Sequence, residues 1–478
     1  MGKPSLILVV VAIAQFMVSL DMSVVNVALP AIRSGLGFDP AGLQWVVDAY
    51  ALLLGGLLLL GGRAGDLYGR RRLFVLGFAL FGLASLAGGL AQSPGQLVTA
   101  RAVQGLAAAA LTPSALAMLT TTFTEGRARA RALGVWGAVA GTGGAVGVMA
   151  GGLLTEYAGW RWVMLINVPV VVGALALTAV TVPADSPGPH RGRLDLLGAV
   201  LGTCGLGLLV FGVVRTHDHP WTSAETLGTL AVAAVLLAGF ILVEARIAKA
   251  PLFRLGLLAN RTVAGANLFV FLLFAGQFAA FYFVSLYMQG VLRMSPAATG
   301  AAFLPFSAGL ICGTVIATRA ARRLTLRALL VPGGLLAAAG FGWFSLISPT
   351  GSFVVHVLGP SLVTSIGLGM CLAPLAGAAT AGAPPHEAGM ASGLINSARQ
   401  IGGCIGLAVL TTVAGRRTGS STDPTALTHG YALSLGISGI LLAIAVAVAL
   451  TVLPKGRPGP PVGTGTRPEE LTVPATAR

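Results

Sequence analysis

Three ionisable residues interrupt long apolar stretches near the start of this sequence: Asp21, Asp48 and Arg101. An ionisable side chain at membrane depth is costly to bury, so it is commonly paired, protonated or in contact with a watery cavity. Two carboxylates that share one arginine are not both fully neutralised, and one of them is then able to take up and release a proton. We therefore predict a proton site, with Asp21 as first candidate, Asp48 as second, and Arg101 as the residue that tunes it.

Each of these residues also has a structural explanation. Asp21 could be the fixed partner of a buried arginine, and Asp48 and Arg101 could extend their side chains to the outer interface. At about 1.5 Å of rise per residue, all three lie in the outer half of their segments. Because the three side chains lie at a similar depth in the membrane, they could form ion pairs. The sequence alone does not show that the three segments touch.

The composition places these residues in a membrane protein. The 478-residue chain is 55% hydrophobic and 9% charged, whereas about a quarter of a soluble protein is charged. The sequence divides into about fourteen apolar spans of roughly 20 residues, which predicts an all-α polytopic membrane protein. The spans lie near residues 6–29, 43–62, 73–91, 97–120, 129–153, 162–182, 194–214, 226–245, 263–291, 297–318, 328–348, 352–376, 388–412 and 430–453.

The stretch Gly62 to Arg72 (GRAGDLYGRRR) sets the orientation. It places Asp66 and four arginines between the second and third spans, and short basic loops are retained in the cytoplasm. The even number of spans then puts both termini in the cytoplasm of a plasma-membrane protein. Most of the 30 basic residues fall on that side. Two lie within spans, Arg101 and Arg399, and six face outward: Arg33, Arg161, Arg215, Arg293, Arg416 and Arg417.

This distribution explains the net charge of +15 by topology and by contact with anionic lipid heads. We therefore exclude nucleic-acid binding. The spans themselves group into two blocks of six, residues 1–182 and 263–453. Between them lie a Pro- and Gly-rich linker (183–193), two additional spans (194–246) and a connector (247–262) that either follows the inner membrane surface or crosses solvent. The tail from residue 454 to 478 is expected to be disordered.

Further polar residues inside the spans are candidates for the wall of a substrate cavity. On the first span Gln15, Ser19, Ser23 and Asn26 share one helical face, and Asp21 points away from it. The last six spans hold no acid that we place at membrane depth, so the proton site is expected in the first block. The candidate cavity residues are Gln15, Ser19, Asn26, Gln104, Gln277, Tyr282, Asn396 and Arg399.

Glycines form a strip along the fifth span. Gly143, Gly147 and Gly151 recur at four-residue steps, which favours close packing of another helix and also permits sliding. Cys204, Cys312, Cys371 and Cys404 are scattered through apolar segments, so we predict small core residues without a metal site. HExxH, GxSxG and Walker A sequences are absent from the chain, which argues against an intramembrane enzyme and leaves an ion gradient as the energy source. No cofactor is expected.

Several motifs, in order along the chain, resemble those of the major facilitator superfamily, and specifically its fourteen-span drug:proton antiporters. The loop signature G-x-x-x-D-[RK]-x-G-[RK]-[RK] is matched by Gly62, Asp66, Gly69, Arg70 and Arg71. Leu20 to Pro30 is similar to the span 1 motif, and WRWVMLINVP, Trp160 to Pro169, to the loop into span 6. The span 4 motif is matched by Arg101, Gln104 and Gly105, and the span 5 antiporter motif by Gly143, Gly147, Gly151 and Gly152.

The resemblance implies a major facilitator fold: two six-helix bundles that rock about a midplane cavity, plus two extra central transmembrane helices. It implies a secondary active exporter that exchanges protons for amphipathic antibiotics, dyes or secondary metabolites. The resemblance also implies that the loop signature acts as a latch and that the monomer is the working unit. Two positions depart from the pattern, Leu67 in place of a cation and Val148 in place of proline. A proton symporter and a dedicated exporter of one metabolite remain as alternatives.

Overall fold

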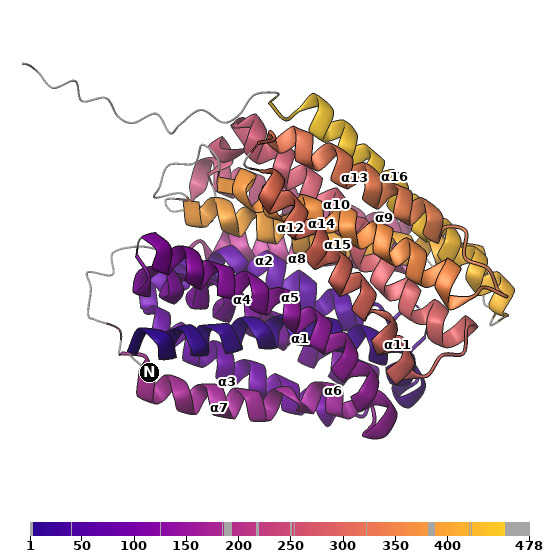
Figure 1. Cartoon of the computed structure of the whole chain (residues 1–478), viewed down its shortest axis with the longest axis horizontal. Helices are drawn as coiled ribbons and strands as arrows, with labels where there is room; N and C mark the ends of the chain where they lie inside the picture. Colours follow the sequence, from indigo (N-terminus) through magenta and orange to yellow (C-terminus); the bar gives the residue numbers. More distant parts are fainter. Residues whose placement is uncertain are drawn as a thin grey trace, which may run out of the picture.

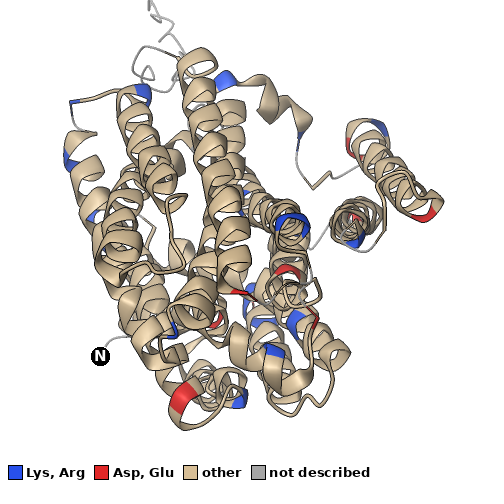
Figure 2. Ribbon diagram, turned by 90° about the vertical axis from the view of Figure 1, so that its right-hand side faces the viewer, with Lys and Arg blue, Asp and Glu red and all other residues tan. Residues whose placement is uncertain are grey.

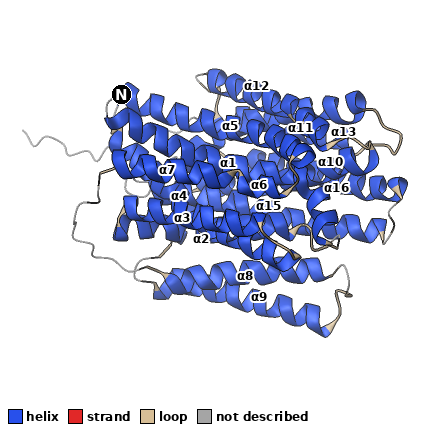
Figure 3. Cartoon of the chain, turned by 90° about the horizontal axis from the view of Figure 1, so that it is seen from below, coloured by secondary structure: helices blue, strands red, loops and turns tan. Residues whose placement is uncertain are grey.

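The structure is a computed structural model that describes residues 3–39, 41–124, 126–183, 185, 194–216, 219–248, 251–252, 254–321, 323–380, 388–419, 421 and 423–454. The predicted tail and most of the 183–193 linker lie outside these residues. Within them the regular structure is entirely helical (Figure 3).

Long apolar runs with few internal breaks produce long helices (Figure 1). The first block contains α1 (Lys3–Leu36), α2 (Trp45–Tyr68), α3 (Arg70–Gly89), α4 (Pro94–Thr122), α5 (Gly126–Tyr157), α6 (Arg161–Leu165) and α7 (Asn167–Thr181). The pair α8 (Leu196–Arg215) and α9 (Ala224–Leu242) follows, extended by η1 (Val243–Ile247) and then by η2 (Leu255–Ala259). The last block contains α10 (Arg261–Leu286), η3 (Tyr287–Val291), α11 (Pro296–Ala302), α12 (Leu304–Ala320), α13 (Leu326–Phe344), η4 (Val354–Leu358), α14 (Gly359–Thr380), α15 (Ala388–Thr418) and α16 (Pro424–Thr451).

The predicted number of spans is confirmed, since 14 helical segments of the described chain are long and apolar enough to cross a membrane. The predicted turn at Gly62 to Arg72 is shorter than expected. Helix α2 continues to Tyr68 and α3 begins at Arg70, so only Gly69 separates them. Gly69 has a φ of 104°, a backbone conformation that glycine adopts without the steric cost of a Cβ atom. Asp66 therefore lies on the last turn of α2.

The two blocks lie side by side, the first at the bottom of Figure 1 and the second at the top. Helix α1 begins at the left of this view, and α16 ends at its upper edge. Helices α8 and α9 form a separate pair beside the other helices (Figures 2 and 3). Apolar residues of α8, among them Val210 and Val213, pack against Leu52 of α2 and Ala408 of α15. The added pair thus covers a seam where the two blocks meet.

The glycine strip of α5 packs against α1. A Cβ atom on Gly143 or Gly151 would lie 2.9 Å from the Phe16 carbonyl oxygen or 2.5 Å from that of Val24, so only glycine permits this approach. In the first half of the same helix, Gly134 and Gly137 have no neighbouring atoms within 4 Å of such a position. The close approach of α5 glycines to α1 is therefore confined to the second half of α5.

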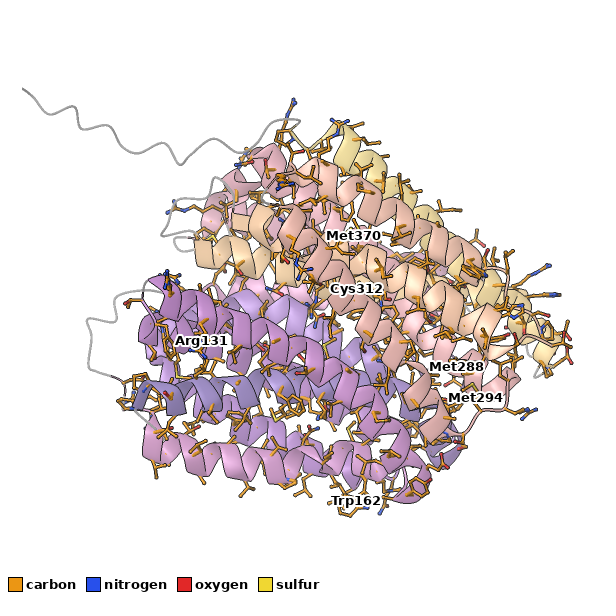
Figure 4. All side chains as sticks on the ribbon, viewed as in Figure 1. Arg131, Trp162, Met288, Met294, Cys312 and Met370 are labelled. Atoms are coloured by element: carbon orange, nitrogen blue, oxygen red, sulfur yellow. The ribbon has the colours of Figure 1, made fainter. Side chains whose placement is uncertain are left out.

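Three hydrogen bonds between the blocks lie toward the right-hand end of Figure 1, where α11 is labelled. Ser285 Oγ donates to the Asn26 carbonyl at 2.9 Å, and Gln289 Nε2 to the Val27 carbonyl at 2.9 Å. The Ala297 amide donates to Glu156 Oε2 at 2.8 Å. Figure 4 labels Met288 and Met294 beside these contacts, and Arg131 at the other end of α5. The molecule is thus closed at the right-hand end.

The cysteine prediction is only half correct. Cys371 and Cys404 are buried, whereas Cys204 and Cys312 are exposed on the outer surface of their helices. An apolar sequence around a cysteine does not distinguish a core position from one that faces lipid, because both surroundings are apolar. The four thiols are free.

Candidate functional site

Asp21 is the centre of a buried hydrogen-bond network in the first block. Its carboxylate has no exposed surface and accepts three hydrogen bonds. Arg101 Nη1 donates to Oδ2 at 2.6 Å, whereas Gln104 Nε2 and Asn167 Nδ2 donate to Oδ1 at 3.2 and 2.9 Å. A buried ion pair is stable only when such additional donors and acceptors complete it, and Asp21 meets that condition.

Four helices position this network. Asp21 lies near the middle of α1, and Asn167 begins α7. Arg101 and Gln104 are three residues apart on α4, so they share a helical face and bond to one another at 2.9 Å. Ser85 of α3 accepts a hydrogen bond from Gln104 Nε2 at 2.8 Å. The network therefore fixes α1, α3, α4 and α7 relative to one another.

The remaining interactions of Arg101 are with residues of α2 and not with a second acid. Its Nε donates to the Val46 carbonyl at 2.9 Å, and its guanidinium carbon lies 4.4 Å from the centre of the Tyr50 ring. The interpretation of two acids sharing this arginine is wrong, because among the described residues Arg101 forms an ion pair with Asp21 and none with Asp48. Snorkelling to the outer interface is also wrong, since Arg101 is 1% exposed.

Asp48 is buried without the partners that Asp21 has. It has no exposed surface, and neither carboxylate oxygen has a hydrogen-bond partner among the described residues. Its carbonyl oxygen lies 3.8 Å from the Cys404 thiol of α15. Asp48 therefore lies where α2 of the first block meets α15 of the second. A snorkelling position at the interface is excluded for Asp48 as well.

The loop signature forms contacts within the first block. Arg70 Nη2 lies 2.9 Å from Asp66 Oδ1, one helical turn away, and both side chains are exposed. Asp185, which follows α7, accepts hydrogen bonds from the amides of Arg71 and Arg72 at 3.0 Å each. It thereby satisfies free amides at the start of α3. Leu67, at the position of the expected cation, is 8% exposed and packs inside the bundle.

The candidate cavity residues do not form one wall. Gln104 belongs to the Asp21 network and has no exposed surface, and Tyr282 is 3% exposed within an aromatic cluster. Gln15 bonds to Ser19, and Asn26 to the carbonyl of Met22 in its own helix. Asn396 is exposed and also bonds within its helix.

Two of these candidates retain unused hydrogen-bonding atoms. Gln277 is buried with no partner for its Oε1 atom, and Arg399 has an enclosed Nε atom with no partner among the described residues. The guanidinium carbon of Arg399 lies 5.0 Å from the centre of the Phe274 ring. These atoms are free to bind a ligand without losing an existing hydrogen bond.

Sequence reasoning missed Asn167, Ser85 and Asp185. Asn167 lies inside the WRWVMLINVP motif, where an amide among apolar residues indicates a buried partner. Ser85 gave no signal, because single serines occur throughout the spans. Asp185 was not identified because it lies in the 183–193 linker, and its contact with the start of α3 is distant in sequence. In the described residues no group of three or more His, Cys, Asp or Glu side chains is placed to hold a metal ion.

Comparison with known proteins places this geometry in a family. Residues 11–407 match the Major Facilitator Superfamily. The chain is 45% identical over 441 residues to the cephamycin export protein CmcT of Amycolatopsis lactamdurans, covering 92% of this chain and 90% of that protein. It is 43% identical to the puromycin resistance protein pur8 of Streptomyces alboniger, covering 92% and 89%.

A solved structure supports the fold. A bacterial homologue of the human lysosomal transporter Spinster, in an inward-facing and unoccupied conformation, aligns with a TM-score of 0.65. Its identity is 16%, and the alignment covers 94% of this chain and 96% of that one. The matched family, the extensive sequence identity and the fold agree: the chain belongs to the Major Facilitator Superfamily and is a many-span membrane transporter rather than an enzyme.

Proposed function

We propose that this transporter exports amphipathic small molecules in exchange for protons. The chain spans the cell membrane with both termini in the cytoplasm and works as a monomer. Two relatives named for cephamycin export and puromycin resistance support an antibiotic or related metabolite as substrate. The basic turn between α2 and α3 supports the orientation, so the closed right-hand end of Figure 1 is the outer end.

The unpaired state of Asp48 is the observation that carries this proposal. Burying an ionised carboxylate without a partner costs several kcal/mol, so the enclosed position described here suits a protonated Asp48. Opening the contact between α2 and α15 would let water reach this residue and let the proton leave. A proton site at the seam between the blocks is therefore linked to the movement that exposes the cavity.

Asp21 takes a different role from the one that its sequence motif suggests. Its charge is already balanced by Arg101 and by two further donors. Exchange of a proton at Asp21 would disrupt bonds that hold four helices together. We therefore place the exchanged proton on Asp48, and assign the Asp21–Arg101 pair to the fixed architecture of the first block.

The loop signature and the glycine helix then serve the movement of the blocks. Asp66, Arg70 and Arg71 lie on the cytoplasmic side, where the exposed charges of Asp66 and Arg70 and the half-buried charge of Arg71 can form new charge-assisted bonds when the inner end closes. Gly62 and Gly69 shape that turn. Gly143, Gly147, Gly151 and Gly152 allow the second half of α5 to lie directly against the backbones of α1 and α11, without interlocking side chains.

The experiment is transport in proteoliposomes that contain the purified carrier. With cephamycin C as the first test substrate, the unaltered protein should couple uphill flux to a pH gradient. Asp48→Asn, which resembles the protonated residue, should lose this coupling while it retains exchange of labelled for unlabelled substrate. Proton-driven flux that is unchanged in Asp48→Asn would contradict the assignment.

The sign of the proton flux separates the alternatives. Substrate and proton moving in opposite directions indicates antiport, whereas movement in the same direction indicates a symporter. Testing cephamycin C beside puromycin distinguishes a carrier of several compounds from a dedicated exporter of one metabolite.

A further inference from the structure

Arg399 of α15 is a membrane-depth cation whose charge is not balanced by the protein. It is joined to no acid by an ion pair, and the three ion pairs in the described part of the chain lie elsewhere. Its Nε atom is enclosed and has no hydrogen-bond partner there. Arg399 is half-buried, and removing part of a guanidinium from water is costly unless an anion accompanies it, so the missing counter-charge requires an explanation.

Arg101 shows what a complete site for such a cation contains. Its guanidinium lies over the Tyr50 ring at 4.4 Å and forms an ion pair with Asp21 at 2.6 Å. Arg399 repeats the aromatic half of this arrangement, with the Phe274 ring 5.0 Å from its guanidinium carbon. The carboxylate half is absent. Arg399 is thus held in position by an aromatic ring and keeps its donors free.

The surroundings of Arg399 contain further unused polar atoms. Tyr50 lies on α2, the helix of the first block that packs against this part of α15, where a Cβ atom on Gly55 would lie 2.7 Å from Gln400 Cβ. The buried Tyr50 hydroxyl has no hydrogen-bond partner among the described residues. Gln400, the next residue on α15, has an unpartnered Oε1 atom. Both blocks therefore contribute unused hydrogen-bonding atoms to the region where α2 meets α15.

We propose that Arg399 binds an acidic group of the transported molecule, and that the carrier accordingly selects amphipathic acids. A guanidinium binds a carboxylate by donating two parallel hydrogen bonds to its oxygens. Phe274 and Phe278, whose rings lie 6.1 Å apart and nearly perpendicular, provide an apolar surface for the remainder of such a molecule. This inference rests on the proposed export function and specifies the chemical class of its substrate.

The test measures equilibrium binding to the full-length carrier in lipid nanodiscs, with no pH gradient. The two probes are a rhodamine dye that bears a free carboxylate and the methyl ester of the same dye, followed by fluorescence anisotropy. The acid should bind at least about tenfold more tightly than the ester, which corresponds to about 1.4 kcal/mol. The ester removes only the acidic charge, so the ratio of the two affinities isolates that group.

Substitutions then assign the preference to one residue. Arg399→Gln should abolish the preference by weakening the acid alone, and Arg399→Lys should retain part of it, because lysine keeps the charge but loses the planar pair of donors. Arg416→Gln is the matched control. It removes the same charge from the same helix, but Arg416 already bonds to the Thr216 carbonyl and lies over Trp221, so the preference should persist.

Three results would overturn the proposal: equal affinity for acid and ester in the unaltered carrier, no binding of either dye, or an equal loss of both in Arg399→Gln. The last result would indicate a purely structural arginine. Because binding is measured without a gradient, a carrier that binds the acid but shows no proton-driven flux would contradict the proposed antiport and leave the assignment of Arg399 in place.

Discussion

Asp21 and Asp48 are both buried carboxylates in the first block, yet their surroundings differ completely. Asp21 accepts bonds from Arg101, Gln104 and Asn167. Asp48 has no partner for either carboxylate oxygen in the described part of the chain. Burial alone therefore does not identify a proton site. The hydrogen-bond partners distinguish the two carboxylates: a carboxylate with a full set of donors stabilises the fold, whereas one without partners can be neutralised by a proton.

The largest difference should appear when each acid is replaced by its amide. Asp21→Asn leaves Arg101 as an uncompensated buried cation, which should lower the stability of the folded carrier by about 3–5 kcal/mol. Asp48→Asn removes no bond, so its stability should stay within about 1 kcal/mol of the unaltered protein. Thermal aggregation of detergent-solubilised carrier, followed by size-exclusion chromatography, ranks the variants.

The double variant Asp21→Asn, Arg101→Gln checks the cause of that loss. Removing both charges eliminates the unpaired cation, so most of the stability should return. If the double variant is as unstable as Asp21→Asn alone, the loss comes from side-chain packing and the ion pair is not its source.

A smaller effect is expected for the neutral members of the network. Asn167→Leu removes one donor to Asp21 and leaves the ion pair intact, so it should cost about 1–3 kcal/mol. Asn267→Leu is the matched control, because Asn267 is also buried in a helix but bonds only to the Val263 carbonyl of its own helix. The same melting assay should rank Asn167→Leu clearly below Asn267→Leu. Equal losses would mean that Asn167 adds nothing specific to Asp21.

The sequence predicted the helices well, because exposing backbone polar groups to lipid is so costly that few structures other than a helix can span a membrane. Apolar length alone located all 14 spans of the described chain. Charge and spacing also predicted a special role for Asp21, Asp48 and Arg101. They could not predict which acid meets the arginine, because that depends on helix rotation and on Asn167, which is 146 residues from Asp21 along the chain.

The second block was harder to interpret from sequence. Gln277, Tyr282, Asn396 and Arg399 are all polar residues in apolar segments, but the structure gives each a different environment. Tyr282 is enclosed by aromatic rings, Asn396 is exposed and bonded within α15, and Arg399 is left without an acid. Polarity in a span indicates that a side chain needs a partner, whereas only the fold shows whether the protein supplies it.

Asp66 extends the comparison to an exposed carboxylate and should show the smallest effect on stability. Its ion pair with Arg70 joins side chains that are 49% and 37% exposed, and such pairs contribute about 0–1 kcal/mol. Asp66→Asn should therefore leave the melting temperature nearly unchanged. If Asp66 latches the inner end of the carrier, however, the same variant should slow substrate exchange in proteoliposomes several-fold.

Glu225→Gln, which removes the acid of the Arg215–Glu225 pair in the added helices, is the control, and its exchange rate should be unchanged. Equal exchange rates in both variants would reduce Asp66 to an ordinary surface charge, whereas a slow but stable Asp66→Asn carrier would show that its carboxylate acts in the conformation that is closed toward the cytoplasm.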